Sequence, residues 1–181
     1  IERAMKLLPH VNFTNAYGLT ETSATICMLG PEDHRSAFNS SDALIKRRLS
    51  SAGRPIPSIE LIIKNDEGNI CLPEELGNVW VRGEQVSGEY KGIGSKLDSE
   101  GWFPTKDRGF LDSDGYLFID GRADDVIVRG GENISPGEIE DVVRTHPNVE
   151  DVAAVAVKDI EWGEAVGLVI VASSPIEDDE I

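Results

Sequence analysis

Cysteine and long apolar runs are both scarce in this chain of 181 residues. The two cysteines, Cys27 and Cys71, form no CxxC pair and belong to no cluster of Cys and His. This pattern excludes a disulfide framework and a zinc site, and predicts free thiols in a reducing, cytoplasmic compartment. The longest apolar runs, residues 152–157 and 166–172, are too short to cross a bilayer, so no transmembrane helix is expected.

Basic residues are also scarce, since 17 Lys and Arg are outnumbered by 33 Asp and Glu, giving a net charge of −16. Such a surface repels phosphate backbones and anionic headgroups, so no nucleic-acid partner is expected. The three histidines are scattered and are expected at the surface or at caps, and the three tryptophans are expected in the core or at an interface. The basic run at residues 46–48 is interpreted as a solvated turn rather than a binding patch.

The charge balance changes along the chain near Gly121. Residues 1–121 hold 13 basic and 18 acidic side chains, a net of −5, whereas residues 122–181 hold 4 and 15, a net of −11. This change predicts a domain boundary. The chain opens within an amphipathic helical pattern and closes in an acidic run, so we expect it to be a fragment of a longer protein.

The first region is predicted to contain short strands separated by glycine and proline. Residues 59–64 and 77–82 have the pattern of strands, and residues 65–69 have turn chemistry. Residues 112–115 (DSDG) predict a hairpin in which Gly115 supplies the positive φ of the turn. Short strands of this kind favour a β-rich, barrel-like subdomain.

The second region alternates element types. Strand-like segments occur at residues 126–128, 152–157 and 166–172. Between the first two, Ser135 is predicted to cap a helix that has Pro136 in its first turn and Glu138 in a capping box, and Pro147 ends it. The predicted fold class is therefore mixed α and β, with the β-rich, barrel-like subdomain followed by a small α+β domain.

Residues 15–21 (NAYGLTE) combine an aromatic ring, a glycine, a hydroxyl and a carboxylate. A ring stacks on a base, a hydroxyl meets a phosphate oxygen, and a carboxylate ligates Mg²⁺. The same residues also fit a plain strand followed by a turn, and the composition of the segment leaves both interpretations open.

The segment strongly resembles a signature of the adenylate-forming superfamily, which includes acyl-CoA synthetases, luciferases and the adenylation domains of peptide synthetases. Further segments similar to family motifs follow in the family's order: residues 75–83 (ELGNVWVRG) with 88–90 (GEY), residues 102–109 (WFPTKDRG) and residues 121–140 (GRADDVIVRGGENISPGEIE). The resemblance therefore extends over most of the chain.

The resemblance implies roles for residues of the first region, taken as the end of the family's large AMP-binding domain (residues 1–121). Tyr17 would lie against the adenine, and Thr20 would contact the phosphates. Glu21 would help to bind Mg²⁺, and Asp107 would accept hydrogen bonds from the ribose hydroxyls. The family's usual glycine before that aspartate is replaced by Lys106, which puts the geometry of this loop in question.

The resemblance also implies roles for residues 122–181, taken as the hinge and a truncated C-terminal domain. Arg122 would bond the ribose or phosphate, and Asp124 would form the hinge between the domains. Gly130 and Gly131 would lie where the pantetheine arm of coenzyme A passes. Two simpler interpretations stay open: the glycine pair is a hairpin turn, and residues 124–125 are a solvated bend.

The activity implied is that of an ATP-dependent acyl- or aryl-CoA ligase. A carboxylic acid and Mg²⁺-bound ATP would give an acyl-adenylate, and coenzyme A would then displace AMP to give a thioester. Such a reaction would serve, for instance, in fatty-acid metabolism. The protein could be an oligomer. The family's phosphate loop is expected upstream of Ile1 and its catalytic lysine beyond Ile181, so the chain alone is expected to be inactive. Alternatives are an adenylation domain that loads a carrier protein's phosphopantetheine, and a non-catalytic nucleotide-fold binding module.

Overall fold

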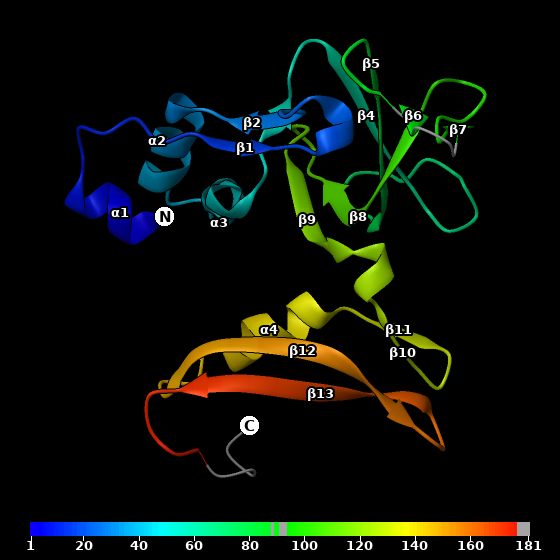
Figure 1. Cartoon of the computed structure of the whole chain (residues 1–181). Coiled ribbons are helices and arrows are strands. Elements are labelled where there is room, and N and C mark those ends of the chain that lie inside the picture. Colours follow the sequence, from blue (N-terminus) through cyan, green and yellow to red (C-terminus); the bar gives the residue numbers. More distant parts are fainter. Residues whose placement is uncertain (88, 91–93, 177–181) are drawn as a thin grey trace. The chain divides into compact units, whose positions relative to one another are not determined.

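The computed structural model describes residues 1–87, 89–90 and 94–176, with the backbone alone at residues 89, 90 and 124. The internal contacts of the chain divide it into two compact units, Ile1–Ile119 and Asp120–Ile181 (Figure 1). The assignment of residues 1–121 and 122–181 to named domains of a family stays a prediction. Among the described residues, no helix combines the length and apolar character needed to cross a membrane.

The first unit opens with short helices around a small sheet. Its first elements are α1 (Glu2–Leu7), β1 (Asn15–Tyr17), η1 (Thr20–Thr22), β2 (Cys27–Leu29), α2 (Pro31–Asn39), α3 (Ala43–Lys46), η2 (Arg47–Ser50) and β3 (Arg54–Pro55). β2 lies between β1 and β3 in an antiparallel sheet. Pro31 stands at the start of α2, where its fixed φ suits the first helical turn and its missing N–H is not needed.

A four-stranded antiparallel sheet follows. Its strands are β4 (Ile59–Lys64), β5 (Gly77–Gly83), β8 (Phe103–Leu111) and β9 (Leu117–Arg122), in the order β4-β5-β8-β9, and β6 (Glu89–Tyr90) pairs separately with β7 (Gly94–Ser95). The two predicted strands at residues 59–64 and 77–82 are confirmed. The expectation of a barrel-like subdomain is wrong for the described residues, because no pairing between β4 and β9 closes the sheet.

The hairpin predicted at residues 112–115 is confirmed. Gly115 has φ +80°, and its N–H donates to the Asp112 carbonyl at 3.0 Å. The Asp112 carboxylate accepts hydrogen bonds from the backbone N–H groups of Asp114 and Tyr116, each at 2.9 Å. The turn is therefore stabilised by its own aspartate, in the way that Asx turns are.

The core of the first unit joins the two sheets. Its buried members are Ile26, Cys27, Ile59, Ile63, Val79, Val81, Val86, Phe103 and Leu117. In β5 the alternate residues Val79 and Val81 are fully buried, as expected for a strand with one face against the core. Cys27 and Cys71 are both free, which confirms the prediction of unpaired thiols.

Two expectations about polar side chains are wrong. His34 is fully buried rather than at the surface, with its Nδ1 2.9 Å from the Gly30 carbonyl oxygen. Lys46 is exposed as expected, but Arg47 and Arg48 of the basic run are not part of a solvated turn: Arg47 lies over the ring of Phe118 and Arg48 over that of Tyr116, with Cζ 5.0 and 4.4 Å from the ring centroids. These arginines pack against aromatic faces, which combines apolar burial with cation–π attraction.

The second unit places a helix on a small sheet, as predicted. Its elements are η3 (Ala123–Asp125), β10 (Ile127–Arg129), β11 (Glu132–Ile134), α4 (Pro136–Val143), β12 (Val149–Asp159) and β13 (Gly163–Ala172). The strand order is β11-β10-β13-β12, and α4 packs on β12 (Figure 1). The predicted cap is wrong, because the Ser135 side chain makes no capping hydrogen bond and its Oγ is buried without a partner among the described residues.

Candidate functional site

The structure brings together two predicted site residues that are far apart in the sequence. Tyr17 ends β1, and its hydroxyl donates a hydrogen bond to Oδ2 of Asp107 in β8. Tyr17 is half-buried and Asp107 is only 6% exposed. Burial, and then the hydrogen bond with the Asp107 carboxylate, raise the pKa of Tyr17 well above its ordinary value. The phenol therefore stays neutral and acts as a donor to Asp107 at ordinary pH.

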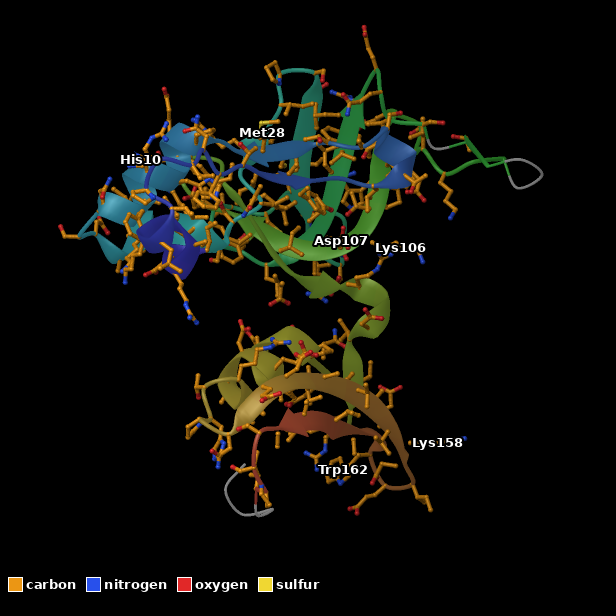
Figure 2. The ribbon with its side chains drawn as sticks, turned by 60° about the vertical axis from the view of Figure 1, so that its left-hand side comes forward. His10, Met28, Lys106, Asp107, Lys158 and Trp162 are labelled. Atoms are coloured by element: carbon orange, nitrogen blue, oxygen red, sulfur yellow. The ribbon has the colours of Figure 1, made fainter. Side chains whose placement is uncertain are left out.

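Asp107 is positioned by an irregularity in β8. Asn78 of β5 lies opposite Arg108, and Trp80 lies opposite Pro104, so residues 105–107 together lie opposite one residue of β5. Such a bulge redirects side chains relative to a regular ladder. Its middle residue, Lys106, has φ +67°, a left-handed conformation in which the family's usual glycine would be unstrained. Figure 2 shows Lys106 and Asp107 as neighbours on β8.

Thr105 supports this bulge from the buried side. Its hydroxyl donates to the Val79 carbonyl at 3.0 Å and accepts from the Asp107 N–H at 3.1 Å. Thr105 is 3% exposed, so these hydrogen bonds are shielded from water. No role for Thr105 was predicted from the sequence, although Thr105 stands two positions before Asp107 in the same motif.

Thr20 and Glu21 lie in η1, a single turn directly after β1. Thr20 is exposed and Glu21 is half-buried. Thr22 closes the turn, with its Oγ1 accepting from the Leu19 N–H at 2.9 Å. Gly18, just before the turn, has no room for a side chain, because a Cβ there would lie 1.4 Å from the Ala24 carbonyl oxygen. The glycine of the NAYGLTE segment is thus required by the close approach of the chain to itself.

The role in Mg²⁺ binding that the resemblance implies for Glu21 stays a prediction. The described residues contain no group of three or more His, Cys, Asp or Glu side chains placed to hold a metal ion. Mg²⁺ bound to ATP, however, takes most of its ligands from phosphates and water and needs only one or two protein carboxylates. The single carboxylate of Glu21 is compatible with that limited number of protein ligands.

The remaining predicted site residues belong to the second unit. Arg122 is the last residue of β9 and is exposed. The backbone of Asp124 belongs to η3, and the side chain of Asp124 lies outside the described part of the chain. Gly130 and Gly131 form the turn between β10 and β11, with φ of +61° and +90°. The simpler interpretation of the glycine pair as a hairpin turn is thus confirmed, and its predicted role toward coenzyme A stays a prediction.

Trp162 packs against this glycine turn. The Gly130 N–H donates to the Trp162 carbonyl at 2.9 Å, and a Cβ at Gly130 would lie 2.8 Å from Cε3 of the indole. Cζ of Arg129 lies 5.2 Å from the centroid of the indole ring. Trp162 is 47% exposed, so it is a surface aromatic that supports the turn.

Gln85 is a further residue of this region whose role the sequence did not indicate. Its side-chain amide nitrogen donates to the backbone carbonyls of Thr22 and Thr25, at 2.9 and 2.7 Å. Gln85 stands between the motif segments at residues 75–83 and 88–90. This position was the only feature of the sequence that pointed to a role for Gln85. Its hydrogen bonds connect the turn of Thr20 and Glu21 to the chain that follows β5.

The chain is similar to known proteins. The model of the AMP-binding enzyme family matches residues 1–91, just over half of the chain. A 2-succinylbenzoate–CoA ligase of Bacillus licheniformis is 37% identical over 179 residues, which cover 97% of this chain and 34% of that protein. The chain therefore spans about a third of the length of the curated relatives that it matches.

Solved structures match nearly the whole chain. One is o-succinylbenzoate CoA synthetase (MenE) from Bacillus subtilis in complex with the acyl-adenylate intermediate OSB-AMP, with a TM-score of 0.79 and 31% identity over 99% of this chain and 35% of that chain. The same synthetase in complex with ATP and magnesium ion matches with a TM-score of 0.78, 31% identity and the same coverage. Because the family model matches just over half of its length, the chain belongs to the AMP-binding enzyme family.

Proposed function

We propose that this chain forms part of an ATP-dependent acyl- or aryl-CoA ligase, which activates a carboxylic acid as an acyl-adenylate and transfers the acyl group to coenzyme A. The observation that carries the proposal is the contact between Tyr17 and Asp107. It places an aromatic ring next to a carboxylate, as needed for a nucleoside with a flat base and two ribose hydroxyls. Segments 90 residues apart meet there, so the pair is a product of the fold.

In the first half-reaction, the carboxylate of the acid attacks the α-phosphorus of ATP and pyrophosphate leaves. Tyr17 would lie against the adenine, and Asp107 would accept hydrogen bonds from the ribose while it keeps the Tyr17 hydroxyl as a donor. Thr20 would donate to a phosphate oxygen, and Glu21 would hold Mg²⁺. When bound, Mg²⁺ supplies positive charge that stabilises the negative charge on the phosphates. Arg122 would contribute a planar guanidinium for the ribose or phosphate.

In the second half-reaction, the thiol of coenzyme A attacks the acyl carbonyl and AMP leaves. Gly130 and Gly131 would let the pantetheine arm pass close to the backbone, since neither glycine carries a side chain. Asp124 would serve as the hinge at which the two domains change their relative orientation between the two half-reactions. The GGENI segment at residues 130–134 resembles the CoA-ligase branch of the family more than the peptide-synthetase branch.

For the acid, we propose 2-succinylbenzoate as the first candidate. The support is that the relatives 34–37% identical to this chain are named 2-succinylbenzoate–CoA ligases. These relatives do not favour the fatty-acid role expected from the sequence. A cytoplasmic location stays a prediction.

The test is acid-dependent exchange of pyrophosphate into ATP by the whole protein, followed by detection of the acyl-CoA thioester. Exchange that depends on 2-succinylbenzoate, with 2-succinylbenzoyl-CoA as the product, is the expected result. Thioester formation on a carrier protein but not on free coenzyme A would identify the carrier-loading alternative. Nucleotide binding without exchange for any acid would indicate a non-catalytic binding module.

A further inference from the structure

Gln85 connects the turn that carries Thr20 and Glu21 to the central sheet. Its Nε2 donates to the carbonyls of Thr22 and Thr25, and its own backbone carbonyl accepts from the Ser23 hydroxyl at 3.2 Å. The Ser58 hydroxyl, just before β4, donates to Gln85 Oε1 at 3.1 Å. The side-chain amide of Gln85 therefore donates hydrogen bonds through Nε2 and accepts one through Oε1.

The segment held by Gln85 has a strained backbone. Ser23 has φ +53° and Ala24 has φ +98°, and both are residues with a Cβ. Such conformations are unfavourable for L-residues and persist only where the surroundings hold them in place. The carbonyls that accept from Gln85 belong to Thr22 and Thr25, the residues that flank this strained pair.

The turn is also fixed on its Glu21 side from the same stretch of chain. The Ser87 N–H donates to the Glu21 carbonyl at 2.7 Å. Between Gln85 and Ser87, Val86 is a buried member of the core, and its N–H donates to the Gly83 carbonyl at the end of β5 at 3.0 Å. The contacts that hold the turn thus start from a segment anchored in the core.

We propose that Gln85 is a positioning residue for Mg²⁺-bound ATP: it holds the strained turn so that Thr20 and Glu21 meet the phosphates and the metal in one fixed arrangement. The inference rests on the proposed function of Thr20 and Glu21 and adds a residue to which the family resemblance gave no role. Without its two donated hydrogen bonds, the strained pair relaxes toward ordinary φ values. The hydroxyl and the carboxylate then lose their alignment.

The test uses the whole protein with two substitutions of Gln85. Gln85→Met removes every side-chain hydrogen bond at similar length. Gln85→Glu keeps an acceptor for the Ser58 hydroxyl, but it removes the donors and adds one negative charge. The matched control is Glu84→Gln, at the exposed neighbouring position. We expect both Gln85 variants to raise the KM for ATP, and thereby to lower kcat/KM for ATP in pyrophosphate exchange by about 10- to 100-fold, as misplacement of binding groups does. The KM for the acid and the rates of Glu84→Gln should stay within about twofold of the wild type.

A role limited to folding would give a different result. It would reduce the active fraction and lower the rates at all substrate concentrations, with the KM for ATP unchanged, and this would overturn the inference. Amide hydrogen exchange at residues 22–25 supplies a second measurement on the 181-residue chain itself. Faster exchange there in Gln85→Met, but not in Glu84→Gln, is expected, and equal protection in both variants would also overturn the inference.

The design separates this inference from the proposed function. A wild-type protein that shows no exchange with any acid contradicts the proposed function. The Gln85 inference is then judged by the Kd for Mg²⁺-bound ATP, measured by calorimetry on the wild type and both Gln85 variants. A wild-type protein that catalyses exchange, with Gln85 variants that match it in KM for ATP, contradicts the Gln85 inference alone.

Discussion

The hydroxyl of Tyr17 donates a hydrogen bond to the carboxylate of Asp107, and the contact joins the end of β1 to the bulge of β8. A carboxylate has two oxygens and about four lone-pair directions, so Asp107 is able to keep this donor and accept others. The phenol in turn is held with its ring beside that carboxylate. In the proposed function, the pair would supply both a stacking surface and an acceptor that are in place before the nucleoside binds.

Replacing Asp107 by Asn should weaken nucleotide binding in the whole protein. The change keeps the size of the side chain and an acceptor for Tyr17, but the bonds to the ribose lose their charge-assisted character. We expect the Kd for AMP, measured by isothermal titration calorimetry, to rise about 10-fold, which corresponds to about 1.4 kcal/mol. Glu84→Gln, which also removes one negative charge, is the control. An unchanged Kd with an intact unfolding transition would show that Asp107 does not bind the ribose.

The contribution of Tyr17 to the free energy of unfolding should be lost in alkali. Burial, followed by the bond with Asp107, raises the pKa of Tyr17 above its ordinary value near 10. Above that pH the unfolded chain loses the phenolic proton while the folded chain keeps it, so this contribution to stability is complete below about pH 10 and declines as the pH rises.

The comparison is urea unfolding of the wild type and Tyr17→Phe between about pH 9 and 11, the range around the ordinary pKa of a phenol. The free energy of unfolding of the wild type should fall more steeply with pH than that of the variant, because all other titrating groups are common to both. Parallel pH curves would mean that the phenol is not held in its neutral form by the fold.

Lys106→Gly should stabilise the first unit. Lys106 has φ +67°, which costs a residue with a Cβ about 1 kcal/mol and costs glycine little. The control is Lys106→Ala, which removes the same long side chain but keeps the Cβ. We expect the glycine variant to unfold with a free energy about 0.5–1 kcal/mol higher than that of the alanine variant, measured in urea. An alanine variant at least as stable as the glycine variant would show that the left-handed conformation is not strained here.

Asp124→Pro should separate the two half-reactions in the whole protein. Proline fixes φ near −65° and removes an N–H, so a hinge that has to change its φ is trapped in one conformation. We expect pyrophosphate exchange to continue while formation of acyl-CoA is largely lost. Loss of both reactions together with a lowered melting temperature would indicate damage to the fold. Retention of both would place the hinge elsewhere.

Features built from neighbouring residues were predictable. The turn at residues 112–115 follows from Asp112 and Gly115, because the carboxylate and the free φ act within four positions. The helix that starts at Pro136 follows from proline and the apolar spacing after it. The predicted cap by Ser135 failed even though it is local: its side chain makes no capping hydrogen bond, and its Oγ is buried without a partner among the described residues.

Contacts between distant segments were decided by tertiary structure. The family resemblance assigned Tyr17 and Asp107 separate roles, but their hydrogen bond exists only because β1 and β8 come together around one core. Gln85 reaches carbonyls about 60 residues away, and His34 is buried although its neighbours in the sequence are polar. Short-range chemistry selects turns and helices, whereas the partners of a buried polar group depend on which segments the hydrophobic core brings together.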